Sequence, residues 1–339
     1  MNAKEVVENL KRNQLDSTIK EFIIDRTMPL PKKEFIEALS YLTKDSYFKD
    51  RAFAELEKID PESIENYFKE RELIPEVALF LFKNFKHKIK RSAFIEIINN
   101  FSIPPQILVE IAKSDDSELL ELLSLKDVKL LAHPEIIDTL ISNPSLPREK
   151  RYRLEEMKRR FIEGEDEETY EEEIKEEELE ETEDEEEESV ITVEMDMGEG
   201  PEVKEFTLNQ IKKMNVAEKI KIALFGNKEI RKILINDPNR LVREAVLQSP
   251  KLTDSEVEGF AKLKSAADDV IRRIAFNKQW TSKYSIALSL IKNPKTPVSF
   301  SLNYLDKLIV RDLKQIQKDK DIPEPVRKKA KILISRKFG

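Results

Sequence analysis

Two nearly identical octets, Leu140-Ile-Ser-Asn-Pro-Ser-Leu-Pro147 and Leu290-Ile-Lys-Asn-Pro-Lys-Thr-Pro297, decide the fold prediction for this chain. In each octet, two aliphatic residues end a buried helical face, and the following proline cannot continue the helix. We expect the asparagine to adopt the left-handed conformation that often follows a helix. In the second octet, we expect Thr296 to cap the next helix and Pro297 to begin it.

Two further stretches, Ile97-Ile-Asn-Asn-Phe-Ser-Ile-Pro104 and Leu247-Gln-Ser-Pro-Lys-Leu-Thr253, are weaker copies of the same stop signal. Asn100 and Asn143 are 43 residues apart, and Ser249 and Asn293 are 44 apart. Helical repeats of the HEAT or armadillo type are about 40–47 residues long. The spacing therefore predicts helical repeats.

The repeat is irregular, because residues 242–249 and 270–277 match imperfectly at an offset of 28. Elsewhere, apolar residues recur at i, i+3, i+4 and i+7, which indicates short amphipathic helices. The short apolar run at residues 190–193 is the one possible strand, and we expect it to be irregular. The predicted fold is all-α, a degenerate HEAT-like α-solenoid. An irregular helical bundle with the same stop signals is the alternative.

The net charge of −8 conceals three regions of very different charge. Residues 163–188 contain 19 Asp or Glu and one Lys, whereas residues 203–339 contain 30 Lys or Arg and 15 Asp or Glu. So acidic a segment has too little apolar content to fold by itself. We predict an N-terminal helical-repeat unit at residues 1–160, a disordered acidic linker at 161–204 and a basic helical-repeat unit at 205–339.

Composition argues against catalysis and metal binding. The chain has no cysteine, two histidines and six glycines, and no glycine precedes Gly164. Thiol chemistry, multi-histidine metal sites and glycine-rich phosphate loops are therefore excluded. We expect no enzymatic activity, no cofactor and no metal. Because the N-terminus is charged every few residues and no apolar run could span a bilayer, we expect a cytoplasmic protein without membrane insertion.

The basic half also carries a family resemblance. Two of its segments resemble the leucine-rich-repeat variant, namely Asp237-Pro-Asn-Arg-Leu-Val-Arg-Glu-Ala-Val246 and Asn293-Pro-Lys-Thr-Pro297. Together with Val216-Ala-Glu-Lys-Ile-Lys-Ile-Ala-Leu-Phe-Gly-Asn-Lys-Glu-Ile-Arg231, they resemble a family of uncharacterised bacterial proteins with HEAT-like repeats, of deltaproteobacterial type. The resemblance covers about residues 205–339. It implies an α-solenoid without known catalysis and transfers no functional residue.

Candidate binding residues lie in the basic half, because basic side chains on successive helices of a solenoid can line one groove. We expect Trp280 and Tyr284 to lie on one helix face, where they could anchor a partner. The alternative for Trp280 is a position in the core between repeats. The alternative for the basic residues is that they form an ordinary solvated surface. The candidate partner-binding residues are Arg231, Arg243, Arg272, Arg273, Lys278, Trp280, Lys283, Tyr284 and Lys292.

Two functions are compatible with these features. The leading hypothesis is a non-enzymatic scaffold that presents helical-repeat surfaces to another protein. The alternative is binding of nucleic acid, or of an acidic partner, by the basic unit at residues 205–339, regulated by intramolecular contact with Glu163–Glu188. The two are distinguished by whether the basic residues gather on one face of the unit.

Overall fold

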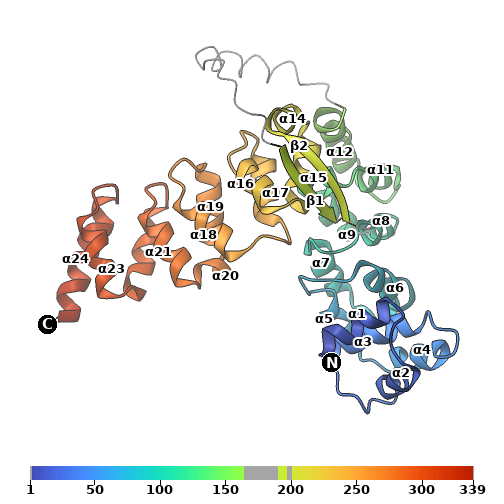
Figure 1. Ribbon diagram of the computed structural model, residues 1–339. Coiled ribbons are helices and arrows are strands. Elements are labelled where there is room, and N and C mark those ends of the chain that lie inside the picture. Colours follow the sequence, from blue (N-terminus) through green and yellow to red (C-terminus); the bar gives the residue numbers. More distant parts are fainter. Residues whose placement is uncertain (1, 164–189, 197–200, 339) are drawn as a thin grey trace. The chain divides into compact units, whose positions relative to one another are not determined.

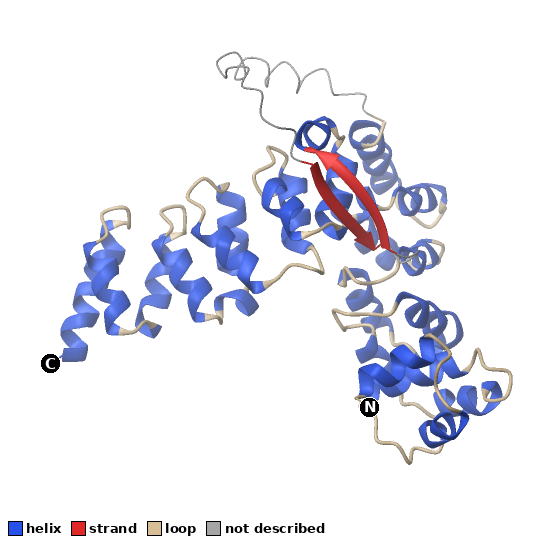
Figure 2. Ribbon diagram, viewed as in Figure 1, coloured by secondary structure: helices blue, strands red, loops and turns tan. Residues whose placement is uncertain are grey.

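The computed structural model describes residues 2–163, 190–196 and 201–338. These residues are mainly α-helical (Figures 1 and 2). The predicted all-α class is confirmed, with one β-hairpin in addition. Most of the segment Glu163–Glu188, and with it the predicted disorder, lies outside the described residues.

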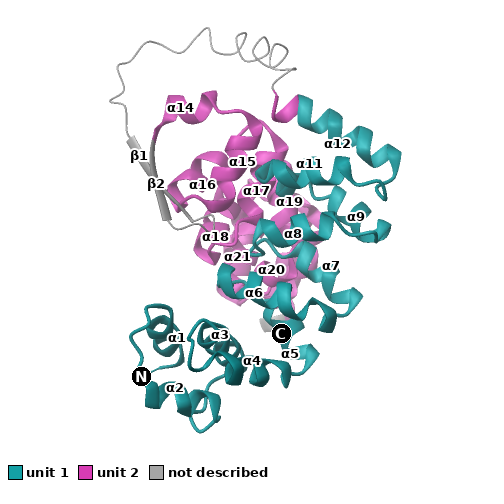
Figure 3. Cartoon of the chain, turned by 90° about the vertical axis from the view of Figure 1, so that its right-hand side faces the viewer, with its two compact units in different colours: residues 1–159 teal, residues 160–339 magenta. Residues whose placement is uncertain are grey.

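The chain divides into two compact units, residues 1–159 and 160–339 (Figure 3). The helices of unit 1 are α1 (Ala3–Lys11), α2 (Ser17–Ile24), α3 (Lys32–Leu42), α4 (Lys49–Glu57), α5 (Pro61–Tyr67), α6 (Pro75–Phe85), η1 (Lys86–Lys88), α7 (Arg91–Asn99), α8 (Pro105–Ala112), α9 (Ser117–Ser124), α10 (Asp127–Ala132), α11 (Pro134–Ser142) and α12 (Arg148–Phe161).

Local sequence signals set the helix starts of unit 1, and burial holds the helices together. The Asp60 carboxylate accepts a 2.8 Å hydrogen bond from the Ser63 amide, and Pro61 occupies the first turn of α5. Such a cap satisfies an amide that has no partner within the helix. Every residue from Ile36 to Leu42 of α3 is buried, and α3 packs against α1, α4 and α6. The core of this end of unit 1 is therefore built around α3.

Unit 2 continues with β1 (Val190–Asp196), β2 (Pro201–Thr207), α14 (Leu208–Lys213), α15 (Val216–Phe225), α16 (Lys228–Leu234), α17 (Arg240–Gln248), α18 (Asp254–Lys262), α19 (Asp268–Phe276), α20 (Lys278–Thr281), α21 (Tyr284–Lys292), α22 (Val298–Tyr304), η3 (Leu305–Lys307), α23 (Val310–Lys318) and α24 (Glu324–Phe338). Along this series, α15 packs against α17, α18 against α21, and α23 against α24. Helices close in sequence thus form the core of unit 2.

The β-hairpin corrects one expectation. β1 and β2 pair antiparallel, with Val190 opposite Thr207 and Asp196 opposite Pro201. We expected residues 190–193 to be irregular because they stand beside the acidic run, and we assigned most of both strands to the linker. The pairing partner, residues 201–207, supplies the backbone hydrogen bonds that a single strand lacks.

The asparagine of each stop octet has a different role from the one expected. Asn143 has φ −80° and ψ 120°, which is extended and not left-handed. Its Nδ2 donates to the carbonyls of Ala112 and Ser114, at 2.7 and 2.9 Å, and its Oδ1 accepts from the Ser145 amide at 2.8 Å. One side chain therefore makes the local turn and also ties it to the end of α8.

The same arrangement occurs in both units. Asn100 donates from Nδ2 to the carbonyls of Phe68 and Glu70, and Asn293 donates to those of Ala261 and Leu263. Both asparagines are extended, with φ −78° and −86°. The left-handed expectation is thus wrong at all three positions. Asparagine suits these positions because its amide donates to carbonyls that the end of a helix leaves unpaired.

These contacts define a shorter spacing than the octets do. Each asparagine reaches 29–32 residues back along the chain. At the weaker octet, the Ser249 hydroxyl donates to the carbonyl of Leu224, 25 residues earlier, at 2.6 Å. The structural spacing is therefore nearer the 28-residue offset than the 43–44 residues between the octets.

The capping expectation for Thr296 and Pro297 is also wrong. Pro297 is the N-cap of α22, while the Thr296 hydroxyl donates to the carbonyl of Leu290, at 2.5 Å, and so closes the preceding helix. Gly226 ends α15 with φ −73° and ψ −176°. Thr253 and Glu256 form a capping box at the start of α18.

Candidate partner-binding groove

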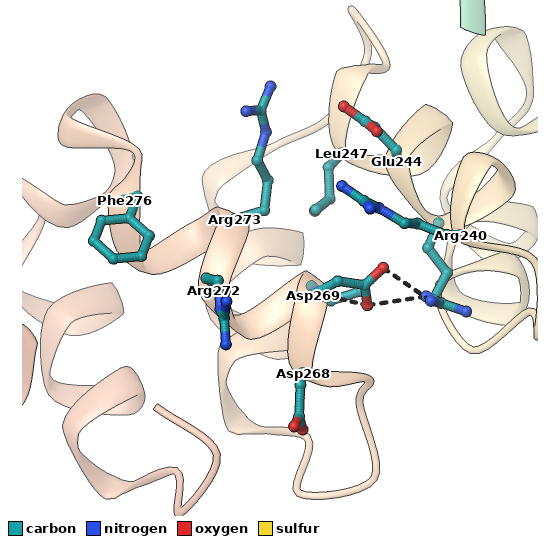
Figure 4. A pocket seen from close by; sticks show the side chains of 10 residues that line it. Arg240, Glu244, Leu247, Asp268, Asp269, Arg272, Arg273 and Phe276 are labelled. Atoms are coloured by element: carbon teal, nitrogen blue, oxygen red, sulfur yellow. Dashed lines mark hydrogen bonds and ion pairs between the residues drawn. The ribbon is translucent and has the colours of Figure 1, made fainter. Parts of the chain in front are cut away.

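A groove of about 510 Å³ lies between α17 and α19 of unit 2 (Figure 4). Three of the predicted site residues line it, namely Arg243, Arg272 and Arg273. The remaining lining residues are Arg240, Glu244, Leu247, Asp268, Asp269, Val270 and Phe276. Part of the predicted set is therefore brought together at one place.

The amphipathic pattern of α19 explains which side chains face the groove. Val270, Ile271, Ile274 and Ala275 are buried in the core. The i, i+3, i+4 periodicity leaves Arg272, Arg273 and Phe276 on the solvent side of the helix. Phe276 is 66% exposed, so its ring adds apolar surface beside the two arginines.

Arg243 links α17 to α19. Its guanidinium donates to both Asp269 carboxylate oxygens, at 3.2 Å from Nε to Oδ1 and 2.8 Å from Nη2 to Oδ2. Its Nη1 also donates to the carbonyls of Asp237 and Pro238, at 2.6 and 2.7 Å. Arg243 is thus occupied by the protein and fixes the spacing of the two helices.

The other three groove arginines have no such hydrogen-bond partners within the described residues. Arg240, Arg272 and Arg273 are exposed, and no side-chain hydrogen bond or ion pair engages them within the described residues. In Figure 4, Arg272 and Arg273 project from α19 and Arg240 from α17. Their guanidinium groups are available to an anionic partner.

The groove is not uniformly basic. Glu244 accepts a 2.7 Å hydrogen bond from Gln248 Nε2. The side chain of Asp268 is 76% exposed, and its Oδ1 lies 3.9 Å from Lys295 Nζ. Cationic, anionic and apolar groups therefore alternate along the surface.

Arg231 lies elsewhere and is 3% exposed. Its Nε donates to Glu256 Oε1 at 2.8 Å, its Nη2 to Oε2 at 3.2 Å and its Nη1 to the Gly226 carbonyl at 2.7 Å. Burial acts to raise the pKa of Glu256, but the hydrogen bonds from Arg231 and Thr253 outweigh it and lower the pKa. Arg231 therefore holds α16 to α18 and is closed to a ligand.

The aromatic pair is divided between core and surface. Trp280 is 7% exposed, in agreement with a core position. Tyr284 is 40% exposed, and its hydroxyl donates to Asp312 Oδ2 at 2.5 Å and accepts from the Ile309 amide at 3.2 Å. Burial, then the hydrogen bond to Asp312, raise the pKa of Tyr284. The expectation of one shared helix face is wrong, because Trp280 belongs to α20 and Tyr284 begins α21. The two rings do not form a joint surface anchor.

The three predicted lysines do not line the groove. Lys283 forms an ion pair with Asp254, and Lys292 Nζ donates to Gln315 Oε1 at 3.0 Å. Lys278 is exposed at the first residue of α20. The basic residues therefore converge only in part, through the arginines of α17 and α19.

Seven of the ten groove residues are absent from the predicted site set, among them Arg240, Leu247 and Phe276. For Phe276 a signal existed, because the period of α19 places it with the exposed arginines. Leu247 is 6% exposed, and its position at the groove depends on how α17 packs, which periodicity does not define.

In the part of the chain that the structure describes, no group of three or more His, Asp or Glu side chains could hold a metal ion. No helix there is both long and apolar enough to cross a bilayer. Searches against protein-family models, curated proteins and solved structures give no match for this chain.

Proposed function

We propose that this chain is a non-enzymatic, cytoplasmic scaffold of HEAT-like α-solenoid repeats that binds another protein through the groove between α17 and α19. The observation that carries the proposal is the exposed cluster of Arg240, Arg272 and Arg273 beside Phe276. Arginine and aromatic residues are enriched at protein interfaces and dominate their binding energy.

The repeat character of the proposal is supported by the recurring contacts at 25–32 residues. Asn100, Asn143, Ser249 and Asn293 each tie a helix end to one that lies about one helical hairpin earlier. In a solenoid each repeat contacts mainly its neighbours, so contacts of this separation are expected throughout.

Protein binding is favoured over nucleic-acid binding by the composition of the groove. A nucleic-acid backbone presents a regular row of phosphates, which would meet Glu244 and Asp268 as well as the arginines. Arg231, Lys283 and Lys292 are engaged within the protein and do not extend the basic surface. A protein partner can instead match the alternation of charge and apolar surface.

Affinity capture from a nuclease-treated cell extract tests this function. The baits are the full chain, the groove variant Arg272→Ala/Arg273→Ala and the control variant Lys331→Ala/Arg336→Ala, which removes two exposed charges from α24. We expect one set of proteins to be retained by the wild-type chain and the control and lost by the groove variant. Retention of the same set by all three baits would contradict the proposal.

A further inference from the structure

We propose that the groove between α17 and α19 binds an acidic peptide segment in which carboxylate side chains flank one large apolar side chain. This inference rests on the proposed function and adds the chemistry of the partner. It is argued from the three exposed arginines, from Phe276 and from two of the three groove carboxylates, Glu244 and Asp268.

The first argument is the contrast between Arg243 and its neighbours. Arg243 has a carboxylate and two carbonyls as partners, which shows how this fold satisfies an arginine that it needs for packing. Arg272 and Arg273 have no such partners within the described residues. Guanidinium groups bind carboxylates in a bidentate manner, so these side chains suit acidic residues of a bound segment.

The second argument concerns the apolar surface. Phe276 follows Arg272 by four residues and Arg273 by three, so all three side chains lie on one exposed turn of α19. The ring is 66% exposed and can cover an apolar side chain placed between two carboxylates. Burying that contact would strengthen the neighbouring ion pairs, because water is removed from around them.

The third argument distinguishes a peptide from a polyanion. Glu244 and Asp268 lie among the arginines and would repel phosphates at successive positions. A peptide alternates charged, apolar and backbone amide groups, and its amides can donate to these two carboxylates. A groove of about 510 Å³ is within the usual size of ligand pockets, about 300–1,000 Å³.

The test uses fluorescence polarisation with the full chain and a labelled seven-residue peptide, in which the central phenylalanine has three glutamates on each side. Comparison peptides carry glutamine in place of every glutamate, or serine in place of the phenylalanine. A 20-nucleotide single-stranded DNA is the polyanion probe. We expect the acidic phenylalanine peptide to bind most tightly, and its affinity to fall as salt is raised.

The groove variant Arg272→Ala/Arg273→Ala should lose about tenfold in affinity, and Phe276→Ser a smaller factor that disappears with the serine peptide. The control Lys331→Ala/Arg336→Ala should stay within about twofold. Melting temperatures of all variants should match that of the wild-type chain, because the substituted side chains are exposed.

Equal binding by the groove variant and the control overturns the inference. So does tighter binding of the DNA that depends on Arg272 and Arg273. If no acidic peptide binds but the groove variant still loses its captured proteins, the inference is wrong and the proposed function stands. If that variant loses neither peptide nor captured proteins, both are wrong.

Discussion

The guanidinium of Arg243 donates two hydrogen bonds to the carboxylate of Asp269, from Nε to Oδ1 at 3.2 Å and from Nη2 to Oδ2 at 2.8 Å. The two residues are 26 positions apart in the sequence. This ion pair joins α17 to α19 at the wall of the groove. It makes Arg243 a structural residue, whereas Arg240, Arg272 and Arg273 of the same groove are exposed.

Replacing Arg243 by alanine should therefore destabilise the protein. The substitution removes hydrogen bonds from a charged donor and leaves Asp269 without its partner, which we expect to cost about 2 kcal/mol. In a unit of this size the melting temperature should fall by about 4–8 °C. Arg272→Ala is the matched control and should change stability by less than about 0.5 kcal/mol. Equal effects of the two substitutions in thermal unfolding would contradict the assignment.

The asparagine contact makes a second prediction. Asn293 is 3% exposed and donates to two carbonyls. Asn293→Ala should cost about 2 kcal/mol because both carbonyls lose their donor. Asn293→Asp should cost more, since a carboxylate cannot donate to them when ionised. Exposed Asn236, which lacks such a contact, provides the control Asn236→Ala. Denaturant unfolding that ranks these three variants in another order would refute the account.

The buried pair of Arg231 and Glu256 makes a third prediction. Arg231→Met should destabilise unit 2 by about 3–5 kcal/mol, because the Glu256 carboxylate would remain buried without its cation. Adding Glu256→Leu to Arg231→Met should recover part of that loss. The folded-state pKa of Glu256 is lowered, so its contribution is present above its unfolded pKa and is lost as pH falls through the folded value. If the change in unfolding free energy of the double variant equals the sum of the changes in Arg231→Met and Glu256→Leu, the two side chains are not directly coupled.

Unit 1 contains a carboxyl group with the opposite pH dependence. Glu37 is 4% exposed, and burial raises its pKa to about 7. Because the folded state holds this proton more tightly than the unfolded chain, stability should be lost as pH rises from about 4.5 through 7. Glu37→Gln should therefore stabilise the protein by about 2–3 kcal/mol at pH 8 and have little effect near pH 4.

Melting temperatures measured across this pH range check the prediction. Glu96 is exposed on α7 and does not act on the pKa of Glu37, so Glu96→Gln is the control. It should keep the wild-type pH profile. A Glu37→Gln variant whose stability relative to wild type does not change with pH would show that Glu37 is ionised normally in the folded protein.

The sequence predicted the helical class because its stop signals and its 3.6-residue periodicity are local properties. The role of asparagine was not predictable in the same way. Asn143 meets Ala112 only after α8 and α11 have packed together, so the need for a donor appears at the tertiary level. The hairpin was missed although Gly198 and Gly200 separate residues 190–196 from 201–207, which is a signal for a turn between strands.

The candidate site could be predicted only in part for a related reason. Arg231 and Arg272 are both arginines on short amphipathic helices, yet one is buried against Glu256 and the other is exposed. That difference is set by a carboxylate 25 residues away from Arg231. The period of α19 did identify its exposed face, whereas its proximity to α17 is a consequence of packing.

Hydrogen–deuterium exchange of the full chain, with and without the acidic phenylalanine peptide, tests the central claim most directly. It locates the segments whose amide exchange is slowed when a ligand orders them. We predict slower exchange in residues 240–248 and 268–276, and no such change in the Arg272→Ala/Arg273→Ala variant. Protection that appears only outside these two segments, or that is unchanged in the variant, would contradict the assignment of the groove.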